Sequence, residues 1–213
     1  MNIVQLCEPY TMISTERLLQ NIRSIDHVQT SKIPGDIVEI GVWKGGSMLA
    51  MIKQYETYGE TSRDFHLYDT FSGMTPPSNY DKDTNGTLAT RLMSHPGVKA
   101  ECSLGEVQSN LSKHATYDTA RVHYHKGDIR TNTVYPDAIA VLRLDTDFYD
   151  STKHELEHFY PLVSDGGIVM IDDYGHWLGC RKAVDEFLQV HPEITLTPID
   201  YTGVYFIKPS RSG

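Results

Sequence analysis

The sequence predicts an α/β fold built on a doubly wound, mostly parallel sheet that ends in an antiparallel hairpin. From Asp36 onward, short β-branched apolar runs alternate with segments of helical spacing, which is typical of a parallel sheet covered by helices on both faces. A glycine-rich turn follows the first run, and acidic residues follow most of the others. The 213 residues fit a single domain, 1–213, that is large enough to bury a core.

Five apolar runs have the length and composition of buried strands. They span residues 36–42, 64–69, 121–126, 138–144 and 167–171. Two further runs, 195–199 and 203–208, are separated by a short Asp-Tyr-Thr-Gly turn, which predicts a hairpin. Ligands of doubly wound sheets bind beyond the carboxyl ends of the strands, so the residues that follow each strand are the candidate site.

Helices are expected between the strands, because apolar residues recur there three or four positions apart. They are predicted at 14–25, 45–57, 151–163 and 179–190. The first would begin at Ser14 or Thr15, which are good capping residues. The stretch from Thr70 to Asn85 holds a glycine, two prolines and two aspartates. It predicts a long irregular loop, a kind of segment that often acts as a functional lid.

Composition narrows the classes of partner. A formal charge of −9 argues against a nucleic-acid partner, whose phosphates need an excess of Lys and Arg. The apolar runs are too short to cross a bilayer and the start lacks a signal-peptide pattern, so a cytoplasmic protein without a membrane partner is expected. Cys7, Cys102 and Cys180 lie far apart, which favours thiols without a zinc or redox role. The sequence is compatible with a homo-oligomer and does not decide the oligomeric state.

The turn after the first strand reads EIGVWKGGS from Glu39 to Ser47. Glycines let backbone N–H groups approach a ligand, and the next helix offers its positive end to an anion. The turn lacks the GxGxxG pattern that holds a dinucleotide pyrophosphate, which argues against a nicotinamide oxidoreductase. Glu39 would repel a pyrophosphate but attract the ammonium group of an amino-acid cofactor. A plain turn between strand and helix is the alternative.

Two further aspartates end the next strands. Asp69 ends the second strand, where a carboxylate is placed to accept hydrogen bonds from ribose hydroxyls. Asp128 follows the third strand and would reach an adenine amine. For Asp128 a turn or helix-cap role is an equal alternative.

Acidic residues also follow the fourth and fifth strands. Asp145 and Asp147 stand in LRLDTDFYDST, and Asp172 and Asp173 stand in GGIVMIDDYG. Neighbouring strand ends lie about 5 Å apart, and like charges at that distance repel unless a cation lies between them. Oxygen ligands without Cys or His favour a hard ion, Mg²⁺ or Ca²⁺. Asp172 and Asp173 can both bind it only if the chain bends there; solvated cap and turn residues are the alternative.

These residues make the sequence similar to a known family. It resembles the macrocin O-methyltransferases, whose members methylate sugar hydroxyls on macrolides and related glycosides. The resemblance spans nearly the whole chain and rests on YTMIS at 10–14, GDIVEIGVWKGGSM at 35–48, YDTFSGM at 68–74, LRLDTDFYDST at 142–152 and IDDYGHWLGCRKAVDEF at 171–187. It implies a Rossmann-like class I methyltransferase fold, bound S-adenosylmethionine, and magnesium held by aspartates.

Carried over position by position, the resemblance assigns most of the strand-end residues. It makes residues 1–30 a segment that covers the cofactor. The cofactor contacts would be Thr11, Met12, Glu39, Gly41, Trp43, Gly46, Ser47 and Asp69, and the position after the third strand adds Asp128. The metal ligands would be Asp145, Asp172 and Asp173.

The expected reaction moves the methyl group of S-adenosylmethionine to a hydroxyl oxygen by in-line displacement. Magnesium would lower the pKa of that hydroxyl, and a vicinal diol chelates metals, which favours a sugar, or else a catechol. Asp145 is the first choice of base, and His176, whose imidazole is the stronger base, is the alternative. Tyr149, Trp177 and Arg181 would shape the acceptor pocket, with ordinary packing or solvation as the alternative. A sugar- or metal-binding module that has lost catalysis is the remaining possibility.

Overall fold

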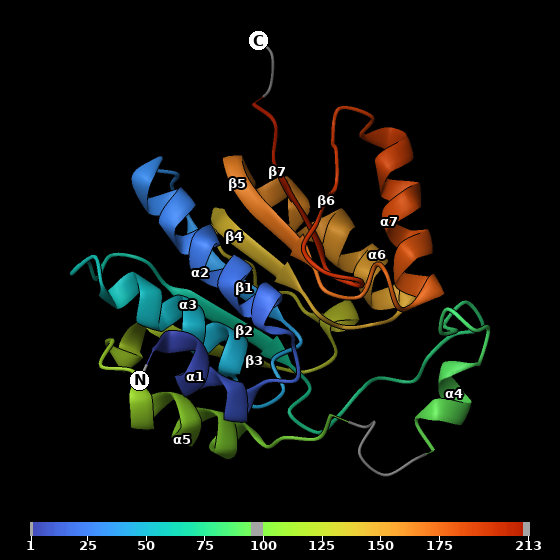
Figure 1. The fold of residues 1–213 in the computed structure, drawn as a ribbon, viewed down its shortest axis with the longest axis horizontal. Coiled ribbons are helices and arrows are strands. Elements are labelled where there is room, and N and C mark those ends of the chain that lie inside the picture. Colours follow the sequence, from blue (N-terminus) through green and yellow to red (C-terminus); the bar gives the residue numbers. More distant parts are fainter. Residues whose placement is uncertain (1, 95–99, 211–213) are drawn as a thin grey trace.

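The computed structural model describes residues 2–94 and 100–210, and its strands form one seven-stranded sheet in the order β3-β2-β1-β4-β5-β7-β6 (Figure 1). The strands are β1 (Asp36–Ile40), β2 (Phe65–Asp69), β3 (Val122–Lys126), β4 (Ile139–Leu144), β5 (Val163–Ile171), β6 (Thr197–Pro198) and β7 (Val204–Ile207). The first five are parallel, and β7 pairs antiparallel with both β5 and β6. The predicted α/β fold with a C-terminal antiparallel pair is confirmed.

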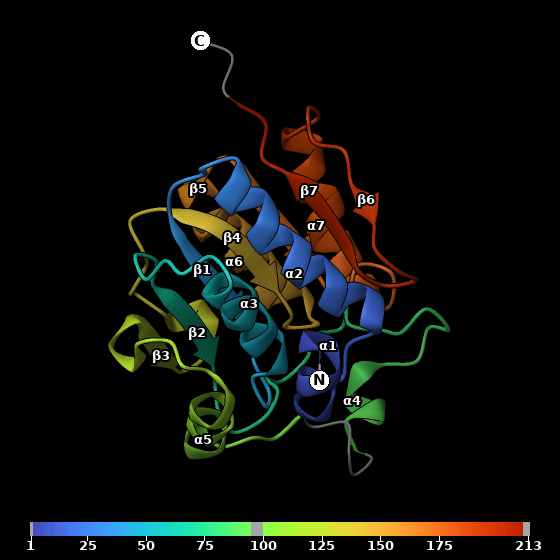
Figure 2. The same cartoon turned by 60° about the vertical axis from the view of Figure 1, so that its left-hand side comes forward.

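Helices cover both faces of the sheet. They are α1 (Ile3–Cys7), α2 (Thr15–Thr30), α3 (Gly46–Glu56), α4 (Ala89–Leu92), α5 (Leu104–His114), α6 (Tyr149–His158) and α7 (Leu178–Val190). Figures 1 and 2 show α2 and α3 on one side of the sheet and α6 and α7 on the other. Strand β4 is buried along its whole length, because both of its faces are covered. In the part of the chain that the structure describes, no helix is long and apolar enough to cross a bilayer.

Three boundaries differ from the predicted ones by more than two residues. The strand predicted at 167–171 begins earlier, at Val163. The helix expected over 151–163 ends at His158, because Tyr160–Leu162 forms a 3-10 turn that contains a proline and β5 begins at Val163. Helix α2 begins after Ser14, whose hydroxyl accepts from the Arg17 amide as expected. It extends to Thr30, beyond the predicted end.

The loop from Thr70 to Asn85 is irregular, as predicted, and is attached to the helices behind the sheet. Asp81 is buried, and its carboxylate accepts from the Tyr149 amide at the start of α6 at 2.8 Å. The Leu178 amide at the start of α7 donates to the Lys82 carbonyl at 2.8 Å. The loop is therefore held against the first turns of both helices.

Candidate active site

A cavity of about 330 Å³ is lined by residues that follow the carboxyl ends of β1, β2, β4 and β5. These elements meet where the strand order reverses between β1 and β4, which is where doubly wound sheets bind ligands. The predicted residues that line it are Thr11, Met12, Glu39, Gly41, Trp43, Ser47, Asp69, Asp145, Asp172, Asp173, His176 and Trp177.

The glycine turn lies directly against the acidic strand end. Gly41 has a φ of +84°, and a Cβ atom there would lie 1.9 Å from the Asp145 carbonyl oxygen. Asp69 holds the same turn, because its Oδ2 accepts from the amides of Val42 at 2.7 Å and Trp43 at 3.2 Å. Gly46 does not line the cavity; a Cβ there would meet the Tyr10 backbone at 2.6 Å, so its role is close packing of the N-terminal segment.

Replacing Gly41 with alanine should destabilise the protein by about 2 kcal/mol or more, because a clash with backbone adds to the strain of a positive φ. Urea unfolding would measure the loss. Gly59→Ala is the matched control, since Gly59 also has a positive φ, +67°, but nothing lies within 4 Å of its Cβ position. Equal losses in the two variants would contradict the close approach at Gly41.

Glu39 is a buried carboxylate with one free oxygen. Its side chain is 1% exposed, and its Oε1 accepts from Arg143 Nη1 at 3.1 Å. Its Oε2 is buried without a hydrogen-bond partner among the described residues. Burial raises the pKa of Glu39 to about 8, although the Arg143 guanidinium opposes the shift. An unpartnered carboxylate oxygen in a cavity wall is suited to a cationic ligand group such as an ammonium.

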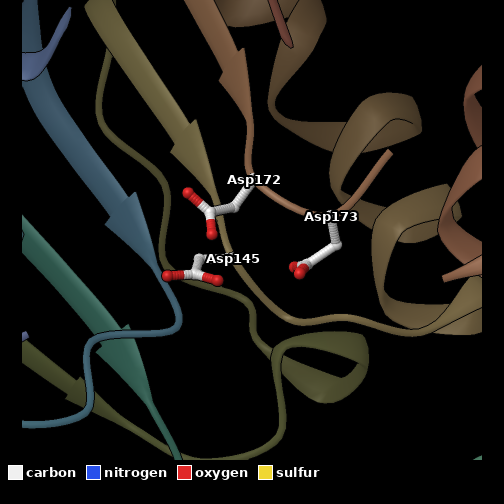
Figure 3. Close-up of side chains that lie close together, drawn as sticks. All are labelled: Asp145, Asp172 and Asp173. Carbon is white, nitrogen blue, oxygen red and sulfur yellow. The ribbon is translucent and has the colours of Figure 1, made fainter. Parts of the chain in front are cut away.

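The three carboxylates predicted to bind metal do lie together. Ligand oxygens of Asp145, Asp172 and Asp173 are all within 4.8 Å of one another, and Figure 3 shows their carboxylates turned toward one space beyond β4 and β5. The chain bends after Ile171, and the Asp173 carbonyl accepts from the amides of His176 and Trp177, both at 3.0 Å. The bend required for Asp172 and Asp173 to face the same space is therefore present.

The electrostatics of this cluster fit a divalent cation. Burial raises the pKa of Asp172 to about 6, with repulsion from Asp145 as the next cause. Burial also raises the pKa of Asp173 well above its ordinary value, and Asp173 Oδ2 is buried without a partner among the described residues. Crowded carboxylate oxygens that resist ionisation are stabilised by a hard ion such as Mg²⁺.

Two arginines that were not predicted from the sequence contact the acidic cluster. Arg143 donates to Asp145 Oδ2 at 2.7 Å and to Asp172 Oδ1 at 2.5 Å. Arg17, from α2, pairs with Asp172 Oδ2 and donates to Asp200 Oδ2 at 2.9 Å. The sequence could have indicated Arg143. It is a charged residue inside an apolar strand, and it stands two positions before Asp145, so the two side chains point to the same face.

Besides Gly46, three predicted contact residues do not line the described cavity: Asp128, Tyr149 and Arg181. Asp128 pairs with Arg130 and accepts from its amide at 3.0 Å, as a cap residue does. The Tyr149 hydroxyl donates to Glu186 at 2.8 Å. Arg181 donates to the carbonyls of Tyr174 and Gly175, and so secures the turn before α7.

The cavity has an aromatic wall beside the carboxylates. The ring of His176 lies edge-on to Trp177 at 5.0 Å and to Tyr201 at 6.3 Å. Trp177 Nε1 donates to Asp147 Oδ1 at 2.7 Å. Tyr201 is 75% exposed and was not predicted as a site residue. Its place in the turn between β6 and β7, which brings it to the cavity, is a matter of tertiary structure.

Comparison with known proteins agrees with this geometry. The family described as Macrocin-O-methyltransferase (TylF) matches residues 7–208. The chain is 34% identical over 202 residues to 8-demethyl-8-(2,3-dimethoxy-alpha-L-rhamnosyl)-tetracenomycin-C 4'-O-methyltransferase of Streptomyces olivaceus, covering 92% of this chain and 75% of that protein. It is 30% identical over 200 residues to Mycinamicin III 3''-O-methyltransferase of Micromonospora griseorubida, covering 92% and 78%.

Solved structures give the same result. The structure of the O-methyltransferase NovP matches with a TM-score of 0.83 and 32% identity, covering 94% of this chain and 83% of that chain. The O-methyltransferase TomG from Streptomyces achromogenes, solved in complex with SAM, shares the fold at a TM-score of 0.56 and 12% identity, covering 98% and 87%.

Proposed function

The chain belongs to the macrocin O-methyltransferase family of S-adenosylmethionine-dependent enzymes, and from this premise we propose that it methylates a sugar hydroxyl of a glycosylated natural product with the help of Mg²⁺. The sugar acceptor is supported by relatives whose names specify rhamnosyl-tetracenomycin and mycinamicin methylation. The magnesium requirement is supported by the acidic cluster.

One observation carries the proposal. Two carboxylate oxygens, Glu39 Oε2 and Asp173 Oδ2, are buried without partners among the described residues and belong to residues that line the same cavity. Buried polar atoms are rarely left unsatisfied in folded proteins. A cofactor ammonium at Glu39 and a divalent ion at Asp173 would satisfy both.

The chain's own residues would position the reactants and take up a proton. Glu39 and Ser47 would hold the methionine part of the cofactor, and Met12 would cover it from the N-terminal segment. Asp145, Asp172 and Asp173 would hold the metal. When bound, magnesium supplies a Lewis acid that lowers the pKa of the acceptor hydroxyl.

Asp145 is the proposed general base. Its side chain is 27% exposed, against 7% for Asp172, so it is the more open of the two to an incoming acceptor. Arg143 holds Asp145 Oδ2 at 2.7 Å, and no described residue donates to Oδ1. That oxygen would face both the metal and the acceptor hydroxyl, whose proton it would accept. His176 lies in the aromatic wall, where it would pack against the acceptor.

Thermal unfolding tests the cofactor assignment. S-adenosylhomocysteine at about 100 times its Kd should stabilise the protein by about 2.7 kcal/mol, which raises the melting temperature by about 5–10 °C for a chain of this size. NAD should cause no shift, because the glycine turn lacks a pyrophosphate-binding pattern. A shift with NAD alone would contradict the assignment.

The acceptor class is tested by methyl transfer itself. Labelled S-adenosylmethionine should pass its methyl group to rhamnosylated polyketides or macrolide glycosides in the presence of Mg²⁺. The aglycones without their sugars are the matched controls. Methylation of the aglycones or of free catechols at the same rate would contradict a sugar acceptor.

A further inference from the structure

Arg143 lies between the cofactor side and the metal side of the site. It stands opposite Glu39 in the register between β1 and β4, and its side chain is 2% exposed. Nη1 donates to Glu39 Oε1 at 3.1 Å and to Asp145 Oδ2 at 2.7 Å, while Nη2 donates to Asp172 Oδ1 at 2.5 Å. One buried guanidinium therefore contacts three carboxylates, one on β1 and one directly after each of β4 and β5.

Arg143 occupies one oxygen of each carboxylate and leaves the other for a different partner. Glu39 Oε2 is unpartnered among the described residues, and none of them donates to Asp145 Oδ1. Asp172 Oδ2 is paired instead with Arg17. Each contact is one charge-assisted hydrogen bond, and the rigid planar guanidinium holds the bonded oxygen of each carboxylate toward it. The carboxylates of Glu39 and Asp145 are thus held by the same side chain.

We propose that Arg143 is a positioning residue that couples the cofactor subsite to the metal subsite. The affinity for Mg²⁺ then depends on whether Glu39 keeps its hydrogen bond to Arg143, because Asp145 and Asp172 share the same guanidinium. The inference rests on the proposed function. If the hydrogen bond between Arg143 and Glu39 is lost, the guanidinium pairs more closely with Asp145 and Asp172. Those carboxylates are then less available to a cation, although Glu39 itself binds no metal.

The test is calorimetric titration of Mg²⁺ without cofactor and of S-adenosylhomocysteine without Mg²⁺. Glu39→Ala should weaken Mg²⁺ binding about tenfold, the size typical of an altered partner of a metal ligand. Glu39→Gln removes the same charge but keeps an oxygen for Arg143, so its effect on Mg²⁺ should be clearly smaller. Glu155→Ala is the control, because Glu155 is also a buried carboxylate but accepts from Thr146 and forms no ion pair with Arg143; it should leave Mg²⁺ affinity unchanged.

Arg143→Lys keeps the charge but loses the fork, and it should weaken both ligands about tenfold. In that background Glu39→Ala should change Mg²⁺ affinity by less than about twofold, because coupled substitutions are not additive. Circular dichroism melting reports whether this variant folds. If it does not fold, the Mg²⁺ affinities of Glu39→Ala and Glu39→Gln are sufficient to test the coupling.

Equal losses of Mg²⁺ affinity in Glu39→Ala and Glu39→Gln would overturn the coupling, since the charge alone would then explain the effect. An undiminished effect of Glu39→Ala in the Arg143→Lys protein would overturn it as well. The wild-type titrations test the proposed function separately, because they report whether Mg²⁺ and S-adenosylhomocysteine bind at all. Binding of both ligands by the wild type with unaltered Mg²⁺ affinity in every variant would reject only the role of Arg143.

Discussion

Asp145→Asn should lower kcat about a thousandfold and leave the affinity for S-adenosylhomocysteine nearly unchanged. The amide cannot accept the acceptor's proton, and general-base catalysis contributes about 10²- to 10⁴-fold. The substitution also removes one charged oxygen ligand from the acidic cluster. Cofactor binding should survive, because Glu39 and Asp69 are untouched. Single-turnover methyl transfer and calorimetric titration of S-adenosylhomocysteine measure the two quantities separately.

Asp147→Asn is the matched control for this variant. Asp147 lies two residues further along the same loop, and burial, with repulsion from Asp145, raises its pKa to about 8. Trp177 Nε1 donates to Asp147 Oδ1 and needs only an oxygen acceptor, which an asparagine amide also supplies. Asp147→Asn should therefore lower kcat less than about tenfold. Full activity in Asp145→Asn would overturn the assignment of the base.

The parallel sheet and its acidic edge could be predicted because they depend on local pattern. The runs that form β1, β2, β3 and β4 are short, apolar and β-branched, and the observed boundaries lie within two residues of the predicted ones. Parallel neighbours bring their carboxyl ends to one edge. The meeting of Asp145 with Asp172 and Asp173 follows from that rule and from the bend after Ile171.

Side-chain direction on the helices could not be predicted in the same way. Tyr149 and Trp177 stand at the starts of α6 and α7 and are both aromatic, yet only Trp177 lines the cavity. Tyr149 turns to Glu186 on α7, and that partner depends on how the two helices pack. Helix α5 was not predicted because it contributes only Val107 and Leu111 as buried residues. The helical pattern there is short and mostly polar.

Removal of divalent ions should reduce turnover at least about a hundredfold, and added Mg²⁺ should restore it. Ca²⁺ also binds oxygen ligands but tolerates looser geometry, so it should restore less activity. The measurement is methyl transfer after treatment with a chelator and exchange into metal-free buffer. Undiminished turnover in metal-free buffer would show that the acidic cluster acts without a metal.

Asp173→Asn tests the same ion from the protein side, with less disturbance than the other two carboxylates allow. Asp145 and Asp172 are paired with Arg143, and Asp172 also with Arg17. Their substitution therefore leaves a buried charge without its partner, which is destabilising in itself. Asp173 forms no ion pair among the described residues, and its Oδ2 is unpartnered. Asp173→Asn should therefore keep the fold and the affinity for S-adenosylhomocysteine.

The same variant should raise the Mg²⁺ concentration for half-maximal activity by about 10- to 100-fold, because one charged oxygen ligand is lost. An activity titration with Mg²⁺, run beside a melting curve, separates this effect from a loss of stability. Because added Mg²⁺ fills a weakened site by mass action, high concentrations should recover part of the rate. A wild-type Mg²⁺ requirement in this variant would remove Asp173 from the metal site and leave its buried oxygen unexplained.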